Sequence, residues 1–255
     1  MITDKTIVDV STWQGNIDDD VMLSRDVIAM IIRLGSITAT TGACYTDYLF
    51  YENHAKFAHE IPCGYYWYFR PKWSGKKQAE FVVKILQEEN ITPNLPIFLD
   101  VESNNANISM TRFASEIIAF ATVITNAGYR FGIYTRGYFW NDNVGTINNA
   151  SEIPLWIARY SLIAVHPWAN NLLSPLRPYP WKDFCLWQWS ADGNHLGKFY
   201  GCDCDSIDLN RANFETVEDF YKWANWKQDQ EPAGCLPIGE TLDKIIEFVQ
   251  SLKEK

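Results

Sequence analysis

The chain has 255 residues, of which 47% are apolar, 21% are charged and 15% are aromatic. This length suits one large α/β barrel or two small domains, and the composition is that of a globular protein. The formal net charge of -9 argues against a nucleic-acid binder, because such proteins gather Lys and Arg on one face. The sequence has no apolar run of 18 residues, and its first residues, MITDKTIVDV, lack the features of a secretory signal. We therefore expect neither a membrane span nor a signal peptide.

Short β-rich runs recur along the chain, and segments of helical period separate most of them. The runs cover residues 6–11, 27–36, 63–70, 95–102, 129–135, 154–160, 184–190 and 206–210. Ser74 is placed to cap a helix that contains AEFVVKILQEE, and Ser109 is placed to cap a second helix over residues 111–127, which Gly128 ends. Such alternation predicts a parallel sheet with both faces covered.

The predicted fold class is α/β, an irregular (β/α) TIM-like barrel with a short C-terminal helical extension. The barrel takes residues 1–226, and four prolines between Pro167 and Pro180 make it irregular on that side. An open doubly wound sheet is the alternative, although neither a GxGxxG motif nor a phosphate loop is present. Residues 227–255 are predicted to be a linker followed by an amphipathic helix. That helix either packs back onto the barrel, or joins a second module or another copy of the chain.

No two of the six cysteines form a CxxC pair; they lie at positions 44, 63, 185, 202, 204 and 235. They fit neither a disulfide scaffold nor a zinc module, so we expect buried thiols. The CDCD stretch at 202–205 lacks two further metal ligands in the sequence. We therefore expect no metal and no cofactor.

Acidic residues end several of the predicted strands. In PIFLDVES (96–103), Asp100 and Glu102 project from the same side of the strand, because side chains alternate along it. Asp9 lies near the end of the first run, and Asp208 lies in the last. In a parallel barrel these positions meet at one rim, although any one of them alone is more commonly a solvated loop residue or a helix cap. Together they predict four carboxylates around one mouth, one of which keeps its proton near neutral pH, as glycoside cleavage requires.

Aromatic residues occupy similar positions in the strands. Their rings can stack on the faces of sugars, so we expect a sugar-binding groove, although any single one can equally be a core residue. The candidates are Tyr66, Tyr134, Trp156, Trp187 and Trp189.

Seven segments in order along residues 5–226 together resemble the glycoside hydrolase family 25 lysozymes, the Chalaropsis-type muramidases common among phage endolysins and bacterial autolysins. The segments are VDVSTWQGNID, GYYWYFR, PIFLDVES, FGIYTRGYFW, PLWIARY, LWQWS and IDLN. The resemblance implies cleavage of the β-1,4 bond between N-acetylmuramic acid and N-acetylglucosamine in peptidoglycan. It further implies Glu102 as general acid, Asp100 as its partner, and Asp9 and Asp208 as residues that orient the sugar, the water and the pair. Trp67 departs from the His that many relatives carry at this position.

Two chemical routes and two functions stay open at this point. Either a carboxylate attacks the anomeric carbon, or the 2-acetamido group of the substrate attacks while Asp100 holds it; adjacent acids favour the second route, which predicts retention of configuration. The alternative function is a catalytically inactive glycan-binding module of a phage particle. As an enzyme, the protein is expected to act on glycan strands of the bacterial cell wall, either as a phage lysin made in the host cytoplasm or as part of a virion.

Overall fold

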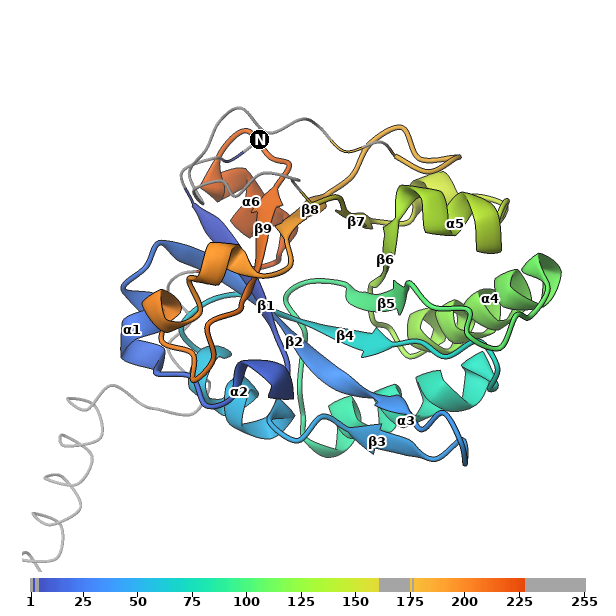
Figure 1. Cartoon of the computed structure of the whole chain (residues 1–255), viewed down its shortest axis with the longest axis horizontal. Helices are drawn as coiled ribbons and strands as arrows, with labels where there is room; N and C mark the ends of the chain where they lie inside the picture. The colour runs from blue at the N-terminus through green and yellow to red at the C-terminus, as the bar shows by residue number, and fades with distance from the viewer. Residues whose placement is uncertain (1, 3–4, 161–174, 176, 228–255) are drawn as a thin grey trace, which may run out of the picture.

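Eight strands form a closed barrel: β1 (Thr6–Val10), β2 (Val27–Ile37), β4 (Cys63–Tyr68), β5 (Ile97–Val101), β6 (Phe131–Arg136), β7 (Leu155–Ala158), β8 (Leu186–Ser190) and β9 (Asp208–Ala212). Around the barrel they follow the order β1, β9, β8, β7, β6, β5, β4 and β2, and β2 pairs with β1 to close the ring (Figure 1). The structure is a computed structural model that describes residues 2, 5–160, 175 and 177–227. The predicted α/β barrel is confirmed, and each predicted β-rich run overlaps one of its strands.

Strand direction departs from the prediction at one place. The pairs from β1 through β2, β4, β5, β6 and β7 to β8 are parallel, but β9 runs antiparallel to both of its neighbours, β1 and β8. The connection from β8 to β9 holds two 3₁₀ turns, η3 (Gly193–His195) and η4 (Lys198–Tyr200), and not the crossover helix that parallel strands need. The prediction of a wholly parallel sheet is therefore wrong at β9. The sequence pattern also missed β3 (Cys44–Thr46), which pairs antiparallel with β2.

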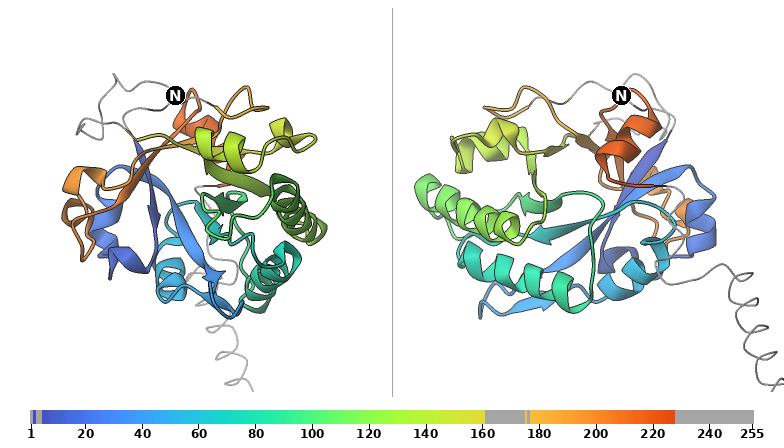
Figure 2. Two further views of the ribbon diagram at one scale, coloured as in Figure 1. Left: turned by 45° about the vertical axis from the view of Figure 1, so that its right-hand side comes forward. Right: turned by 180° about the vertical axis from the view of Figure 1, so that it is seen from behind.

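Helices surround the barrel on its outside (Figure 2). They are α1 (Asp19–Leu23), α2 (Phe50–Phe57), α3 (Gly75–Glu88), α4 (Met110–Asn126), α5 (Gly137–Asn143) and α6 (Val217–Trp223), with further 3₁₀ turns η1 (Thr12–Gln14) and η2 (Ala150–Glu152). The predicted caps of α3 and α4 are confirmed, since the hydroxyl of Ser74 accepts from the backbone N–H of Lys77 at 3.2 Å and that of Ser109 from Arg112 at 3.4 Å. Gly128, just beyond α4, has a φ of 86°, which suits a glycine at a helix end.

Alternation along each strand divides the side chains between two cores. On β5, Ile97, Leu99 and Val101 pack in the larger core that also holds Phe113 and Phe120 of α4. Phe98 belongs instead to the second core, with Trp156 of β7, inside the barrel. Because Asp100 lies two positions after Phe98, its side chain faces the same interior. The barrel is thus filled by rings at this level and by carboxylates at the next.

Several predictions fall outside the described residues. These include most of the proline-rich segment (161–174 and 176) and residues 228–255, so the boundary after residue 226 and the C-terminal amphipathic helix stay predictions. Within the described ranges, no helix is both long and apolar enough to cross a membrane. The five cysteines of those ranges are free thiols, and Cys63 and Cys202 are buried.

Candidate active site

Four carboxylates surround one cavity of about 230 Å³ at the end of the barrel. Asp9 and Asp100 come from β1 and β5, Glu102 directly follows β5, and Asp208 opens β9. Asp9 and Asp208 are direct partners in the β1–β9 ladder. Since β9 runs antiparallel, its first residue and not its last reaches this rim. The four acids that the sequence singled out therefore lie together, although the route that brings Asp208 there differs from the predicted one.

Asp9 and Asp208 face each other across the β1–β9 ladder, where Asp9 is buried and Asp208 is partly exposed. Asp9 is only 4% exposed, and its Oδ2 accepts from Nε2 of Gln188 and from Nδ2 of Asn210, each at 2.8 Å. Burial raises the pKa of Asp9 to about 6, although those two hydrogen bonds oppose the rise. Burial and the nearby charge of Asp9 raise the pKa of Asp208 well above its usual range. Both shifts favour a pair that holds fewer than two negative charges.

A network of neutral side chains fixes the orientation of Gln188. The hydroxyls of Tyr134 and Tyr160 both donate to its Oε1, at 2.7 and 2.8 Å. Because two donors occupy the amide oxygen, the amide nitrogen must face the acids. Asn210 is held in the same way, since Nε1 of Trp156 donates to its Oδ1 at 2.7 Å. Both amides therefore present N–H groups to Asp9.

Asp100 and Glu102 differ in their access to solvent. Asp100 is 5% exposed, and its buried Oδ1 has no hydrogen-bond partner among the described residues. Burial, reinforced by the charges of Glu102 and Asp9, raises the pKa of Asp100 well above its usual range. The Glu102 side chain is 25% exposed; burial raises its pKa, while Arg136 and Arg33 oppose the rise. The site therefore has a buried carboxyl group, on Asp100, beside a partly exposed one, on Glu102.

Two arginines that the sequence analysis missed balance part of this negative charge. Nη2 of Arg136, at the end of β6, lies 3.5 Å from Oε2 of Glu102, and the guanidinium of Arg136 stacks over the ring of Tyr160. Arg33, on β2, lines the same cavity, and its Nε lies 4.0 Å from Oδ2 of Asp47. Both lie in the C-terminal parts of their strands, so the same positional rule that selected the acids could have found them.

Three of the five predicted aromatic residues line the cavity: Tyr66, Tyr134 and Trp156. The ring centroids of Tyr134 and Trp156 are 4.5 Å apart, and Trp156 also meets Tyr66 edge-on. Trp156 is 1% exposed and Tyr134 is 5% exposed. These rings build the floor of the cavity, where they orient polar partners and leave little face for a sugar.

The expectation for Trp187 and Trp189 needs correction, because neither lines the cavity. Both flank Gln188 on β8, and alternation turns them outward when Gln188 points inward. They are buried in the larger core between the barrel and its covering layer. Trp67 also lies in that core, where its indole N–H donates to Oε1 of Gln78 at 2.9 Å.

Trp13 is the exposed aromatic side chain of this site, and the sequence analysis did not select it. It lies in the turn η1 directly after β1, lines the cavity and is 77% exposed. Ser11 caps this turn, because its hydroxyl accepts from the backbone N–H of Trp13 at 3.2 Å. In the described ranges, no group of three or more His, Cys, Asp or Glu is arranged to hold a metal ion.

We expect an Asp9→Asn variant to be more stable than the wild type at pH 7 but not at pH 4. The folded-state pKa of Asp9, about 6, exceeds its ordinary value of 3.8. Between these pH values the folded protein therefore holds a proton that the unfolded chain has released. The stability from this group is complete below about pH 4 and is lost as the pH rises through 6. A shift of about two pKa units corresponds to a loss of about 3 kcal/mol in the free energy of unfolding of the wild type at pH 7. The variant avoids this loss, because its amide does not ionise. Chemical denaturation of both proteins at the two pH values measures the difference. Asp142→Asn, at an exposed site, is the control, and a difference independent of pH would contradict the assignment.

The chain is similar to proteins of a known family. The model for glycosyl hydrolases family 25 matches residues 8–198. The autolytic lysozyme of Clostridium acetobutylicum is 27% identical over 157 residues, which is 61% of this chain and 45% of that protein. The chain thus spans less than half the length of this relative.

Solved structures share the fold. The bacterial lysozyme from Streptomyces coelicolor superposes with a TM-score of 0.68 and 24% identity, covering 89% of this chain and 100% of the other. The spore cortex lytic enzyme SleM from Clostridium perfringens gives 0.69 and 23%, covering 84% and 68%. The CTP1L endolysin gives 0.61 and 18%, covering 87% and 70%.

Proposed function

Because this chain belongs to glycosyl hydrolase family 25, we propose that it is a muramidase, which cleaves the β-1,4 bond between N-acetylmuramic acid and N-acetylglucosamine in peptidoglycan. The observation that carries the proposal is the cavity in which Glu102, open to solvent, adjoins the buried Asp100 and faces the Asp9–Asp208 pair. Retaining glycoside hydrolases need one carboxyl group that is protonated at rest and a second group that supports the anomeric centre.

Glu102 is the proposed general acid. Burial raises its pKa and so favours the protonated form, which can donate to the departing glycosidic oxygen. The carboxylate that remains is stabilised by Arg136, at 3.5 Å. The same carboxylate then accepts a proton from the water that completes hydrolysis. The arginine thus offsets the cost of the charge that the reaction leaves on Glu102.

Asp100 is proposed to hold the 2-acetamido group of the substrate while its carbonyl oxygen attacks the anomeric carbon. The unpartnered Oδ1 of Asp100 is a free acceptor for the amide N–H of that group. Attack from within the substrate followed by attack of water gives two inversions, and hence net retention. An NMR time course of the first product should show the β anomer, and an initial α anomer would contradict this route.

Asp9 is proposed to stabilise the positive charge that develops on the sugar ring. Its pKa of about 6 lies below neutral pH, and two amide N–H groups fix its position before substrate arrives. A charge that is already in place costs no reorganisation during the reaction. Asp208 supports it as a proton donor within the pair.

The alternative, an inactive glycan-binding module, is weakened by the retention of all four acids. Four carboxyl groups in one cavity raise the free energy of folding, and a binder gains nothing from that cost. Mass spectrometry of cell walls digested with the protein tests the proposal directly. Products with muramic acid at the reducing end support it, whereas reducing N-acetylglucosamine or intact walls would contradict it.

Trp13→Ala is expected to raise KM about fivefold and to leave kcat within twofold. The exposed indole offers a face on which a sugar beyond the cleaved bond can stack, and such a contact is worth about 1 kcal/mol. Steady-state kinetics on soluble glycan chains measures the effect, and Trp13→Phe should recover most of it. Tyr138→Ala is the matched control, since Tyr138 is 76% exposed and lies outside the cavity. Equal effects of the two alanine variants would remove Trp13 from substrate binding.

The bacterial cell wall is the proposed place of action. The names of the relatives, an autolytic lysozyme and an endolysin among them, support this setting. Whether the protein reaches the wall as a phage lysin or as part of a virion, and what residues 228–255 contribute, stay predictions.

A further inference from the structure

A second cavity, of about 210 Å³, lies beside the active site. Its lining includes Arg70, Pro71, Lys72 and Trp73 from the loop before α3, and Ser103 and Ala106 from the loop after β5. We call it the cationic cavity. It shares no lining residue with the active-site cavity.

The cationic cavity adjoins the active site through two neighbouring side chains. Ser103 directly follows Glu102, which lines the active-site cavity together with Tyr68. The guanidinium of Arg70, which lines the cationic cavity, lies 5.1 Å from the centre of the Tyr68 ring. A substrate group that extends from the active site past Tyr68 would therefore approach Arg70, which lines the cationic cavity.

The charge of this cavity is opposite to that of the protein. Its lining contains two cations and no carboxylate, in a chain of net charge -9. None of the ion pairs found in the described ranges includes Arg70 or Lys72. By contrast, both arginines of the active site lie close to acids. Uncompensated cations in a hollow favour a ligand that carries negative charge.

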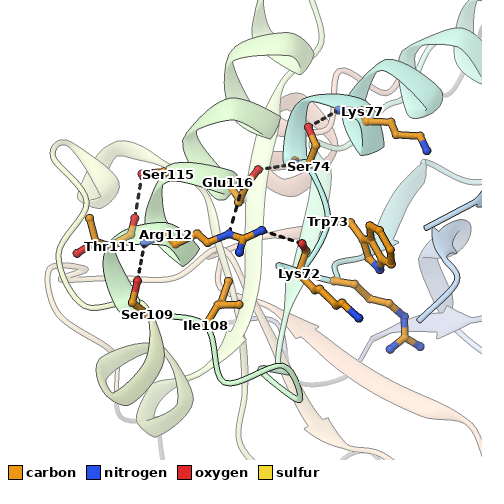
Figure 3. Close-up of polar contacts among 12 residues, drawn as sticks. Lys72, Trp73, Ser74, Lys77, Ile108, Ser109, Thr111, Arg112, Ser115 and Glu116 are labelled. Atoms are coloured by element: carbon orange, nitrogen blue, oxygen red, sulfur yellow. Dashed lines mark hydrogen bonds and ion pairs between the residues drawn. The ribbon is translucent and has the colours of Figure 1, made fainter. Parts of the chain in front are cut away.

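The loop that presents the cations is held in place from several sides. Nε2 of Gln78 donates to the carbonyl oxygens of Arg70 and Trp73, at 3.1 and 3.2 Å. Arg112, from α4, donates to the carbonyl oxygen of Lys72 at 2.9 Å, while its Nε lies 4.0 Å from Glu116 (Figure 3). A site held in its binding conformation loses little entropy when a ligand arrives.

Trp73 forms a wall that is fixed by close packing. A Cβ atom at Gly42 would come within 2.6 Å of the Trp73 ring, so only a glycine allows this approach. Nζ of Lys77, on α3, donates to the carbonyl oxygen of Gly42 at 2.8 Å and so fixes the turn between β2 and β3 against α3. The cavity thus combines a rigid aromatic wall with small apolar side chains and two cations.

We propose that the cationic cavity binds a carboxylate of the peptide stem that N-acetylmuramic acid carries on its lactyl group. This inference rests on the proposed function, in which the cleaved bond starts at the anomeric carbon of that sugar. The stem then branches from the sugar whose glycosidic bond Glu102 protonates. Ser103, which follows Glu102 in the chain, lines the cationic cavity. The planar guanidinium of Arg70 suits a carboxylate, and the apolar walls suit the methyl groups of alanine residues in a stem.

Binding of synthetic disaccharide-peptides tests the inference without turnover. Titration calorimetry compares two ligands, one whose stem has a free carboxylate on its second residue and one in which that group is an amide. The wild type should bind the acid about tenfold more tightly than the amide, a difference of about 1.4 kcal/mol. Arg70→Gln combined with Lys72→Gln should lose this preference. Lys72→Gln alone, at an exposed side chain, should lose about a third to a half of it on the logarithmic scale.

The matched control is Lys84→Gln combined with Lys222→Gln, which removes two exposed cations elsewhere. It should keep the full preference. If the double variant at 70 and 72 retains the preference for the acid, the inference is overturned, whatever the protein does to cell walls. If binding depends on both cations and the walls stay intact, the muramidase proposal fails and the binding site stands. The synthetic ligands contain no phosphate. If Arg70 and Lys72 affect binding to whole cell walls but not to these ligands, the two cations bind phosphate polymers of the wall, and the inference is also overturned.

Discussion

Glu102→Gln is expected to lower kcat on peptidoglycan by about a thousandfold, the usual size of a general-acid contribution. Gln has the same shape but no proton to give to the departing oxygen, so KM should stay within threefold. The defect should shrink strongly on a disaccharide with an aryl leaving group of low pKa, because such a group departs without protonation. Turbidity loss and steady-state kinetics measure the first effect, and release of the aryl group measures the second.

The control for this variant is Glu80→Gln, an exposed carboxylate on α3 with 56% of its side chain in solvent. It should clear walls at the wild-type rate. Glu102→Asp should retain a little more activity than Glu102→Gln, since it keeps a proton but withdraws it by one methylene. Equal clearing by Glu102→Gln and the wild type would remove Glu102 from the mechanism.

Asp100→Asn should lower kcat by about a hundredfold with little change in KM. The amide can still fill the buried position, but its added N–H group opposes the amide N–H of the substrate, so the acetamido group loses its orientation. We expect little loss of stability, because the amide has nearly the size of the buried carboxyl group, whose Oδ1 has no hydrogen-bond partner among the described residues.

The route is tested with the same variant. If the acetamido group is the nucleophile, Asp100→Asn should show its full defect on substrates that carry this group, and hydrolysis of glycans without it should be negligible for both proteins. If the wild type cleaves a de-N-acetylated glycan at an unchanged rate, a carboxylate of the enzyme is the nucleophile and the proposed part of Asp100 is wrong. Asp142→Asn serves as the control for a lost surface charge.

Much of the barrel could be predicted because its strands are short, apolar and separated by turn signals. The run around Leu99 has both faces buried, and the caps at Ser74 and Ser109 follow local rules of hydrogen bonding. Strand direction could not be read in this way. It depends on whether a connection carries a crossover helix, and the segment before β9 gave only turns. The edge strand β3 is three residues long, which is too short for a period to emerge.

The candidate site was predictable where a single rule applied. Acids at strand ends share a rim, and this located Asp9, Asp100 and Glu102. Trp187 and Trp189 failed because proximity to a strand end says nothing about which face a side chain takes; only the inward position of Gln188 decides that. Gln188, Asn210 and Tyr160 were missed because neutral groups gain their importance from tertiary contacts alone, and Tyr134 was selected for its ring and not for its hydroxyl.

Because Asp9 pairs with Asp208, the proposed active site is complete only when β9, the last strand of the barrel, has formed. A growing polypeptide that has reached Glu102 already contains three of its four acids, yet the last strand and the amide that orients the first acid do not exist. Such a nascent product is expected to be harmless to any wall it meets, as is every proteolytic fragment cut before β9. On the proposed function, activity is therefore expected only after β9 has inserted between β1 and β8 and closed the ring.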